Sequence, residues 1–226
     1  MATDHRVGYR AEESIARLAT RLRDAHVPQT DLTFNIVNFV ECTLRNFPEW
    51  GSLEIEFYDR AFKEDTPSYV TFDPLTLNVD RKLWADAKID DGNARYVIAH
   101  EIGHIVLHDH SAKAFSNNKA DQIRYADQGQ SAEWQANAFA GYFLLPDHIV
   151  ERINDYERIV IMCDVPEPLA LDRLLTVRRQ KERAKHRARQ FEGGFCSNCG
   201  NFSLLRTGTL LKCTTIGCET VISRLP

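Results

Sequence analysis

Two groups of residues in this sequence have the types and spacing that metal chemistry requires. The first is His100-Glu101-Ile102-Gly103-His104, which has the pattern H-E-x-x-H. Histidines four residues apart lie one above the other on a helix face, so both imidazoles can bind one ion. Glu101 can then hold a metal-bound water and accept its proton. The pattern predicts a hydrolytic zinc site, because three protein ligands leave one position of Zn²⁺ open for water.

The third ligand must come from outside this pattern. His110 stands ten residues after His100, as the third histidine does in the metzincin pattern H-E-x-x-H-x-x-G-x-x-H. In that pattern a glycine lets the chain turn back after the helix, but this sequence has Leu107 at that position. Leucine favours a continued helix, which would carry His110 away from the metal. His108 extends the row of histidines by another helical turn, too far along the axis for one ion. We expect His108 and His110 to be solvated residues at the helix end.

Glu133 is the other candidate for the third ligand. It lies in the first turn of a helix predicted from Ser131 to Leu145. A carboxylate from a second helix would complete a site with two histidines and one glutamate. Asn137, four residues later on the same face, could hydrogen-bond one of the ligands. Taken by itself, Glu133 is one of 32 acidic residues, and a charge at a helix N-terminus also explains it.

The sequence around these residues resembles the ImmA/IrrE family of metallopeptidases. The segment Glu133-Trp-Gln-Ala-Asn-Ala-Phe-Ala-Gly-Tyr-Phe-Leu-Leu-Pro146 is similar to the family signature E-x-x-A-N-x-F-A-x-x-L-L-x-P, and Arg95-Tyr-Val-Ile-Ala-His100-Glu-Ile-Gly-His104 is similar to the other signature helix. The resemblance covers about residues 50–150, and it departs from the family where Pro146 directly follows Leu145. It implies a gluzincin-type zinc site with His100, His104 and Glu133 as ligands and Glu101 as the catalytic base.

The resemblance also implies a function. Family members are endopeptidases of narrow specificity that cleave transcriptional repressors, so we expect a protein substrate of that kind, cut by Glu101-assisted attack of a zinc-bound water. The strands before the active helix suit an extended peptide that adds to a sheet edge, although the sequence leaves open whether Ser68–Phe72 or Thr76–Val79 is that edge. The alternative is a non-catalytic, nucleic-acid-binding regulator whose zinc sites are structural.

The second metal group lies near the C-terminus. Cys196-Ser-Asn-Cys199 and Cys213-Thr-Thr-Ile-Gly-Cys218 form two pairs separated by 13 residues. Four thiolates at such spacings can form a tetrahedral shell around a structural Zn²⁺. The intervening residues predict two strands joined at Thr207-Gly208, an arrangement that resembles a zinc ribbon. We therefore expect two zinc ions, one catalytic and one structural, and we expect Cys42 and Cys163 to be buried thiols.

A basic segment precedes the cysteines. Residues 173–189 carry eight Lys/Arg and one Glu, whereas the whole chain has a net charge of −4. This segment and the ribbon could contact phosphates of a nucleic acid, or the segment could be a solvated helix that balances an acidic domain. Gly193-Gly194 marks a domain boundary. The pattern predicts three parts: a metallopeptidase domain at 1–170, a basic helical connector at 171–192 and a zinc ribbon at 193–226.

The remaining elements follow from hydrophobic periodicity. Helical spacing appears over residues 8–25 and 34–44, alternation over 53–57, and a hairpin over 68–79. We therefore predict an α+β, zincin-like domain with a small mixed or antiparallel sheet. At 226 residues and 43% hydrophobic, the chain is long and apolar enough for a globular core. It begins without a signal-peptide pattern and contains no apolar run of membrane length, so we expect a cytoplasmic protein without membrane association.

Overall fold

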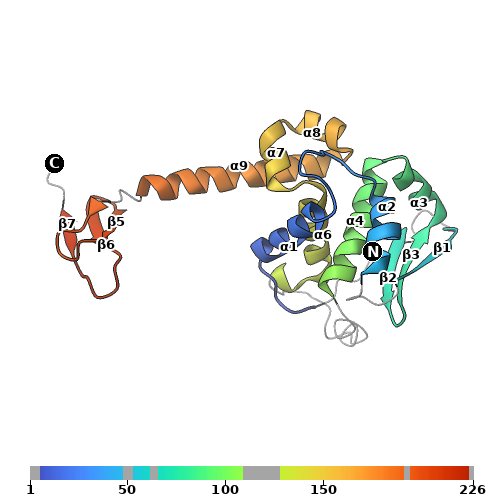
Figure 1. Ribbon diagram of the computed structural model, residues 1–226, viewed down its shortest axis with the longest axis horizontal. Coiled ribbons are helices and arrows are strands. Elements are labelled where there is room, and N and C mark those ends of the chain that lie inside the picture. Colours follow the sequence, from blue (N-terminus) through green and yellow to red (C-terminus); the bar gives the residue numbers. More distant parts are fainter. Residues whose placement is uncertain (1–5, 48–52, 62–65, 109–127, 191–193, 224–226) are drawn as a thin grey trace. The chain divides into compact units, whose positions relative to one another are not determined.

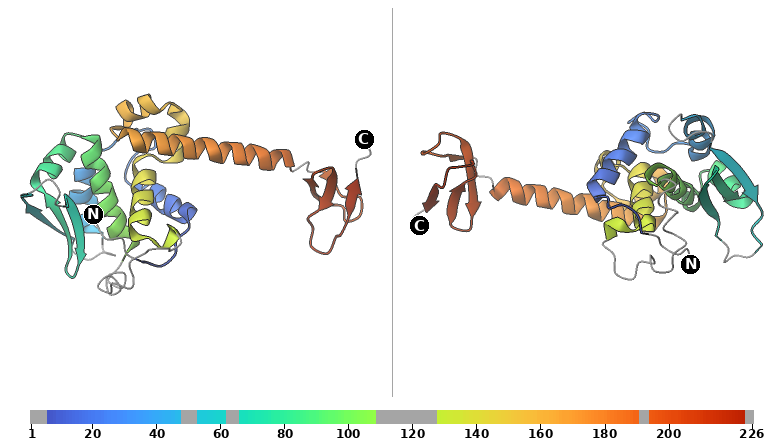
Figure 2. Two further views of the ribbon diagram at one scale, coloured as in Figure 1. Left: turned by 180° about the vertical axis from the view of Figure 1, so that it is seen from behind. Right: turned by 90° about the horizontal axis from the view of Figure 1, so that it is seen from below.

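The structure has the predicted α+β architecture. The computed structural model describes residues 6–47, 53–61, 66–108, 128–190 and 194–223. The chain divides into two compact units, Met1–Leu174 and Leu175–Pro226, here called the N-terminal and C-terminal units (Figure 1). In the N-terminal unit a small sheet lies at one edge with the helices on one side of it, and the C-terminal unit contains a separate four-stranded sheet (Figure 2). The predicted boundaries near residues 170 and 192 stay predictions.

The sheet of the N-terminal unit has three strands: β1 (Glu54–Tyr58), β2 (Ser68–Phe72) and β3 (Leu75–Asp80). β2 and β3 form the predicted antiparallel hairpin, and β1 pairs with β3 in parallel. The order β1-β3-β2 makes β3 the central strand, and five of its six residues are buried. β2 is therefore an edge strand, and it packs against helix α4. Of the two hairpin strands, β2 is therefore the one at the sheet edge.

Two helices carry the signature residues, α4 (Gly92–Leu107) and α6 (Ala132–Leu144), and they pack side by side. The side chains of Asp91 and Ser131 cap them, each accepting a hydrogen bond from a backbone N–H of the first turn. Short polar side chains are favoured there because they satisfy amides that have no partner inside the helix. α6 starts within one residue of its predicted start at Ser131.

Gly103 allows the two helices to approach closely. A Cβ atom at this position would lie 3.0 Å from both the Cα and the carbonyl oxygen of Ala136 in α6. A glycine inside a helix costs about 1 kcal/mol relative to alanine, so its presence between the two histidines needs a structural reason. The contact with the backbone of α6 supplies that reason, and it brings the two signature helices within reach of one ion.

The N-terminal helical segments only partly follow the prediction. α1 (Glu12–Asp24) packs against α6 as a regular helix with a buried face. The segment predicted as one helix over 34–44 is instead a chain of short pieces: α2 (Ile36–Asn38), the π-helical η1 (Phe39–Thr43) and the 3₁₀-helical η2 (Leu44–Asn46). The β-branched residues of this stretch do not explain the irregularity, because α4 contains five such residues and is a regular α-helix.

Three further helices have no counterpart in the sequence interpretation. They are α3 (Arg81–Lys88), α7 (Asp147–Ile153) and α8 (Tyr156–Cys163). None exceeds eight residues, so the apolar period repeats for barely two turns and gives a weak signal. Asp80 and Asp155 cap α3 and α8, and this capping was the signal that could have revealed them.

Buried arginines hold the N-terminal unit together. The guanidinium groups of Arg23 and Arg95 lie 5.1 and 5.9 Å from the centroid of the Phe34 ring, and both side chains are about 1% exposed. Arg95 donates hydrogen bonds to the carbonyl oxygens of Phe34, Cys163 and Asp164, and so ties α4 to the end of α8. Burial lowers the pKa of Arg23 to about 10, which still leaves it charged at neutral pH.

The C-terminal unit begins within the long helix α9 (Glu167–Gln190), whose first turns belong to the N-terminal unit. Its strands β4 (Gly194–Phe195), β5 (Phe202–Thr207), β6 (Leu210–Cys213) and β7 (Val221–Ser223) form one antiparallel sheet in sequence order. β5 and β6 meet at the predicted Thr207-Gly208 turn, where Gly208 has φ +65°. Within the described ranges, no helix combines the length and apolar character that a membrane span requires.

Candidate metal centres

The structure brings His100, His104 and Glu133 together between α4 and α6. The Nε2 atoms of the two histidines lie 3.0 Å apart. Glu133 Oε2 is 3.3 Å from His100 Nε2, and Glu133 Oε1 is 3.5 Å from His104 Nε2. Two ligands bound at the Zn–N distance of about 2.0–2.1 Å in a tetrahedral shell lie about 3.3 Å apart. The three donors therefore have the chemistry and the spacing of one zinc shell.

Asn137 fixes the ring of His100. Its Oδ1 atom lies 2.8 Å from His100 Nδ1 and also accepts a hydrogen bond of 2.9 Å from the hydroxyl of Tyr96. Because an amide oxygen can only accept, Nδ1 of His100 carries the hydrogen and Nε2 presents its lone pair toward Glu133. The structure thus places Asn137 in the role that its position four residues after Glu133 suggested.

His108 is buried, so its predicted solvation is wrong. Its side chain is 9% exposed, with Nδ1 3.1 Å from His104 Nδ1 and Nε2 3.2 Å from Gln135 Oε1. The prediction failed because Gln135 lies on the neighbouring helix α6, a contact that residue types along α4 do not show. His110, the other candidate weighed as a third ligand, lies outside the described residues.

The hydrogen-bond partners of Gln135 determine which nitrogen of each histidine carries a hydrogen. Its amide group donates to the carbonyl oxygens of Gly8 and Gly129, at 2.8 Å each, so its Oε1 must accept from His108 Nε2. Burial lowers the pKa of His108 to about 4, so the ring is neutral and its Nδ1 accepts. His104 Nδ1 is then the donor, and the lone pair of His104 Nε2 faces His100 and Glu133.

Burial and neighbouring charges have opposite effects on the pKa values of His100 and Glu101. Burial works to lower the pKa of His100, but the hydrogen bond with Glu133 and the charges of Glu101 and Glu133 outweigh it and raise that pKa. Glu101 is 5% exposed, and burial raises the pKa of its carboxyl to about 7, against the opposing effect of His100. Glu101 is thus a carboxyl that can gain or lose a proton near neutral pH.

The four cysteines of the C-terminal unit converge on a second point. Cys196 Sγ lies 3.8 Å from Cys218 Sγ, Cys199 Sγ lies 3.6 Å from Cys213 Sγ, and all four sulfurs lie within 4.8 Å of one another. Sulfurs at about 2.3 Å from a tetrahedral Zn²⁺ are about 3.8 Å apart, so the cluster fits a Cys₄ shell.

The backbone turns around these cysteines explain the geometry. Gly200 and Gly217 have φ +72° and +82°, in the left-handed region where a side chain would be strained. The hydroxyls of Ser203 and Thr215 hydrogen-bond to sulfur and lower the pKa of the Cys213 thiol to about 6, which favours the thiolate that binds metal.

The remaining two cysteines differ from each other. Cys163 is buried, as expected, and burial raises the pKa of its thiol to about 11. Cys42 is exposed, so the prediction that it is buried is wrong. At about 100° per residue, Cys42 falls on the side of the segment opposite the buried Ile36, Val40 and Leu44, so the helical spacing could have predicted its exposure.

Comparisons with known proteins agree with the signature helices. Residues 60–160 match the family model described as the IrrE N-terminal-like domain, Peptidase_M78. A vitamin B12-dependent ribonucleotide reductase of Bradyrhizobium diazoefficiens is 48% identical over 42 residues, which are 19% of this chain and 3% of that protein. A solved structure of a Mycobacterium tuberculosis transcriptional regulator has a TM-score of 0.46 and 17% identity, covering 70% of this chain and 45% of that one. The chain spans less than half the length of both relatives.

Proposed function

Residues 60–160 form an IrrE N-terminal-like domain, and from this premise we propose that the protein is a zinc-dependent endopeptidase of narrow specificity. The observation that carries the proposal is the convergence of His100, His104 and Glu133 on one point, next to a buried carboxyl group in the same helix turn. A purely structural zinc site would need the three ligands but has no use for Glu101.

Each residue of the site has a definable task. Zn²⁺, when bound, would polarise the substrate carbonyl and lower the pKa of a water molecule. Glu101 would take up a proton from the attacking water and return it to the leaving amine, for which a pKa of about 7 is suitable because the carboxyl can exist in either form. Asn137 and His108 would keep the two imidazole rings in their binding orientation.

The edge strand β2 is the place where we expect the substrate backbone to bind. β2 pairs with β3 alone among the described strands, and it packs against α4, the helix that carries Glu101. An extended peptide could add to this edge and present its backbone carbonyl to the metal group. The sheet order thus supports β-augmentation by β2 rather than by β3.

We propose a transcriptional repressor or similar regulator as the substrate. The N-terminal unit carries 29 Asp/Glu against 18 Lys/Arg, a net charge of −11. Such a surface attracts basic proteins, and DNA-binding repressors are basic in their contact regions. Incubation with candidate repressors, followed by mass mapping of the fragments, tests the proposal. We expect one specific cut that a chelator prevents; no cut in any candidate, or cuts that persist after complete zinc removal, would contradict it.

Two observations favour a second candidate function, a nucleic-acid-binding regulator. The C-terminal unit carries ten Lys/Arg against three Asp/Glu, a net charge of +7. Phe195 and Phe202 on the ribbon are 58% and 74% exposed, with ring centroids 5.7 Å apart, so bases could stack there. This function predicts salt-dependent binding to DNA or RNA that Cys196→Ser weakens. The two functions are compatible, because they use different units.

A further inference from the structure

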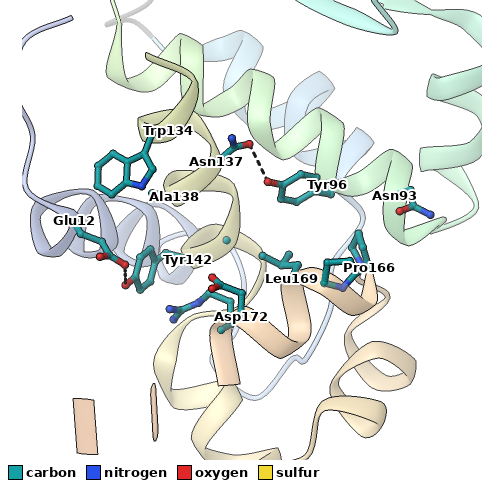
Figure 3. A pocket seen from close by; sticks show the side chains of 13 residues that line it. Glu12, Asn93, Tyr96, Trp134, Asn137, Ala138, Tyr142, Pro166, Leu169 and Asp172 are labelled. Atoms are coloured by element: carbon teal, nitrogen blue, oxygen red, sulfur yellow. Dashed lines mark hydrogen bonds between the residues drawn. The ribbon is translucent and has the colours of Figure 1, made fainter. Parts of the chain in front are cut away.

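A groove of about 520 Å³ lies next to the histidine–glutamate group in the N-terminal unit. It is lined by residues of α1, α4, α6 and the start of α9 (Figure 3). Asn137 and Tyr96 form one wall, and Asn137 is the residue that holds the ring of His100. Trp134, which follows Glu133 in α6, also lines the groove. A substrate residue next to the scissile bond can therefore extend its side chain into this space.

The walls of the groove are mostly aromatic or aliphatic. The lining residues include the rings of Tyr96, Trp134 and Tyr142 and the side chain of Leu169; Figure 3 shows Tyr96 beside Asn137 and Tyr142 beside Glu12. Pro166 and the backbone of Gly141 complete the surface. Such walls bind the carbon stem of a long side chain, and aromatic faces also attract a cation, most strongly a guanidinium group.

The charged groups of the groove leave it with a negative balance. Glu12 and Asp172 both line it, and Glu12 accepts a hydrogen bond of 2.8 Å from the hydroxyl of Tyr142. The cation that also lines the groove, Arg173, is 3% exposed and already forms an ion pair with Asp147. Its guanidinium lies 3.8 Å from the centroid of the Tyr142 ring, so its charge is already paired within the protein. Two carboxylates therefore remain for a ligand.

We propose that this groove binds a basic side chain of the substrate, arginine in preference to lysine, in a residue adjacent to the scissile bond. The inference rests on the proposed peptidase function and names part of its substrate specificity. The carbon stem would lie against Tyr96 and Leu169, and the guanidinium would pair with Asp172 and Glu12. Arginine is preferred because its planar group can stack on a ring and bind a carboxylate through two parallel hydrogen bonds.

Peptide hydroxamates test this inference without relying on cleavage. The zinc-loaded full chain is titrated by calorimetry with hydroxamates that carry arginine or citrulline, in two series that place this residue on either side of the zinc-binding group. Citrulline has nearly the shape of arginine but no charge. We expect at least tenfold tighter binding of the arginine compound in one series. The double variant Glu12→Gln, Asp172→Asn should lose this preference, while Glu13→Gln on the same helix should retain it.

A charge reversal separates specificity from structure. Asp172→Lys should favour a glutamate hydroxamate over the arginine compound, a change that simple loss of stability would not produce. Equal binding of the arginine and citrulline compounds in both series would overturn the inference and leave the peptidase function standing. No hydroxamate binding to the zinc-loaded chain in either series would instead contradict the proposed metal site, and with it both proposals.

Discussion

Replacing His108 by phenylalanine should weaken zinc binding at the histidine–glutamate group, although His108 is not a proposed ligand. In the native arrangement His108 accepts the hydrogen of His104 Nδ1 at 3.1 Å and passes a hydrogen bond to Gln135 at 3.2 Å. Phenylalanine fills the space but accepts nothing. The tautomer of His104 with its hydrogen on Nε2 would then be favoured, and in that tautomer Nε2 has no lone pair to offer the metal.

The magnitude follows from the loss of one outer hydrogen bond to a ligand. Removing such partners typically lowers metal affinity about 10- to 100-fold. This is about 1.4–2.8 kcal/mol, within the range of about 1–3 kcal/mol expected for a buried donor left without a partner. Gln135→Leu should have a similar but smaller effect, because His108 remains able to accept from His104 after it loses its own acceptor.

The assay is competition with a chelator on the full chain, read through bound Co²⁺. Cobalt in a four-cysteine shell gives strong sulfur-to-metal charge-transfer bands that a histidine–glutamate shell lacks, so the two sites can be followed separately. Leu44→Ala, a cavity-forming change in η2, which contributes no proposed metal ligand, controls for lost stability. Nitrogen-15 spectra of the histidines should also show His104 protonated at Nδ1 in the metal-free protein. Unchanged affinity in His108→Phe, or His104 protonated at Nε2, would refute the reasoning.

Other predictions concern packing and thiol reactivity. Gly103→Ala would place a Cβ 3.0 Å from the backbone of Ala136, so urea unfolding should show a loss of about 1–3 kcal/mol of stability; a stabilised variant would contradict the close approach. Arg95→Met leaves three carbonyl oxygens without their donor and should cost about 3 kcal/mol or more in the same measurement, whereas a near-neutral result would mean that the buried arginine contributes little. Iodoacetamide at pH 8 should label the exposed Cys42 readily in the native state. It should leave the buried Cys163 unlabelled, because burial raises the pKa of that thiol to about 11 and keeps it protonated. Mass spectrometry of the peptides reports the order of labelling, and labelling of Cys163 before Cys42 would contradict this prediction.

Much of the candidate site could be predicted because its determinants are local. His100 and His104 share a helix face by their spacing alone, and the glycines next to the cysteines mark tight turns. A glycine inside a helix, such as Gly103, indicates a close neighbour, here Ala136 in α6. Signals of this kind depend on residues within one element or one turn.

What could not be predicted depends on contacts between distant elements. His108 is buried because Gln135 of α6 accepts its hydrogen bond and because Gln135 is itself held by Gly8 and Gly129. The edge position of β2 depends on the parallel pairing of β1 with β3, and hydrophobic alternation does not encode strand order. Arg95 is charged and would be placed at the surface by residue type, yet three carbonyl oxygens from two distant segments keep it in the core.

The comparison of Glu101→Gln with the wild-type chain tests the central claim most directly. Both proteins are loaded with zinc, their metal content is measured, and each is incubated with a repressor that the wild type cleaves. Glutamine keeps the size of the side chain but cannot accept a proton from water. We predict two zinc ions per chain in both proteins and cleavage by the wild type alone. Cleavage by the variant at the wild-type rate, with full zinc content, would contradict the assignment of Glu101 as the general base.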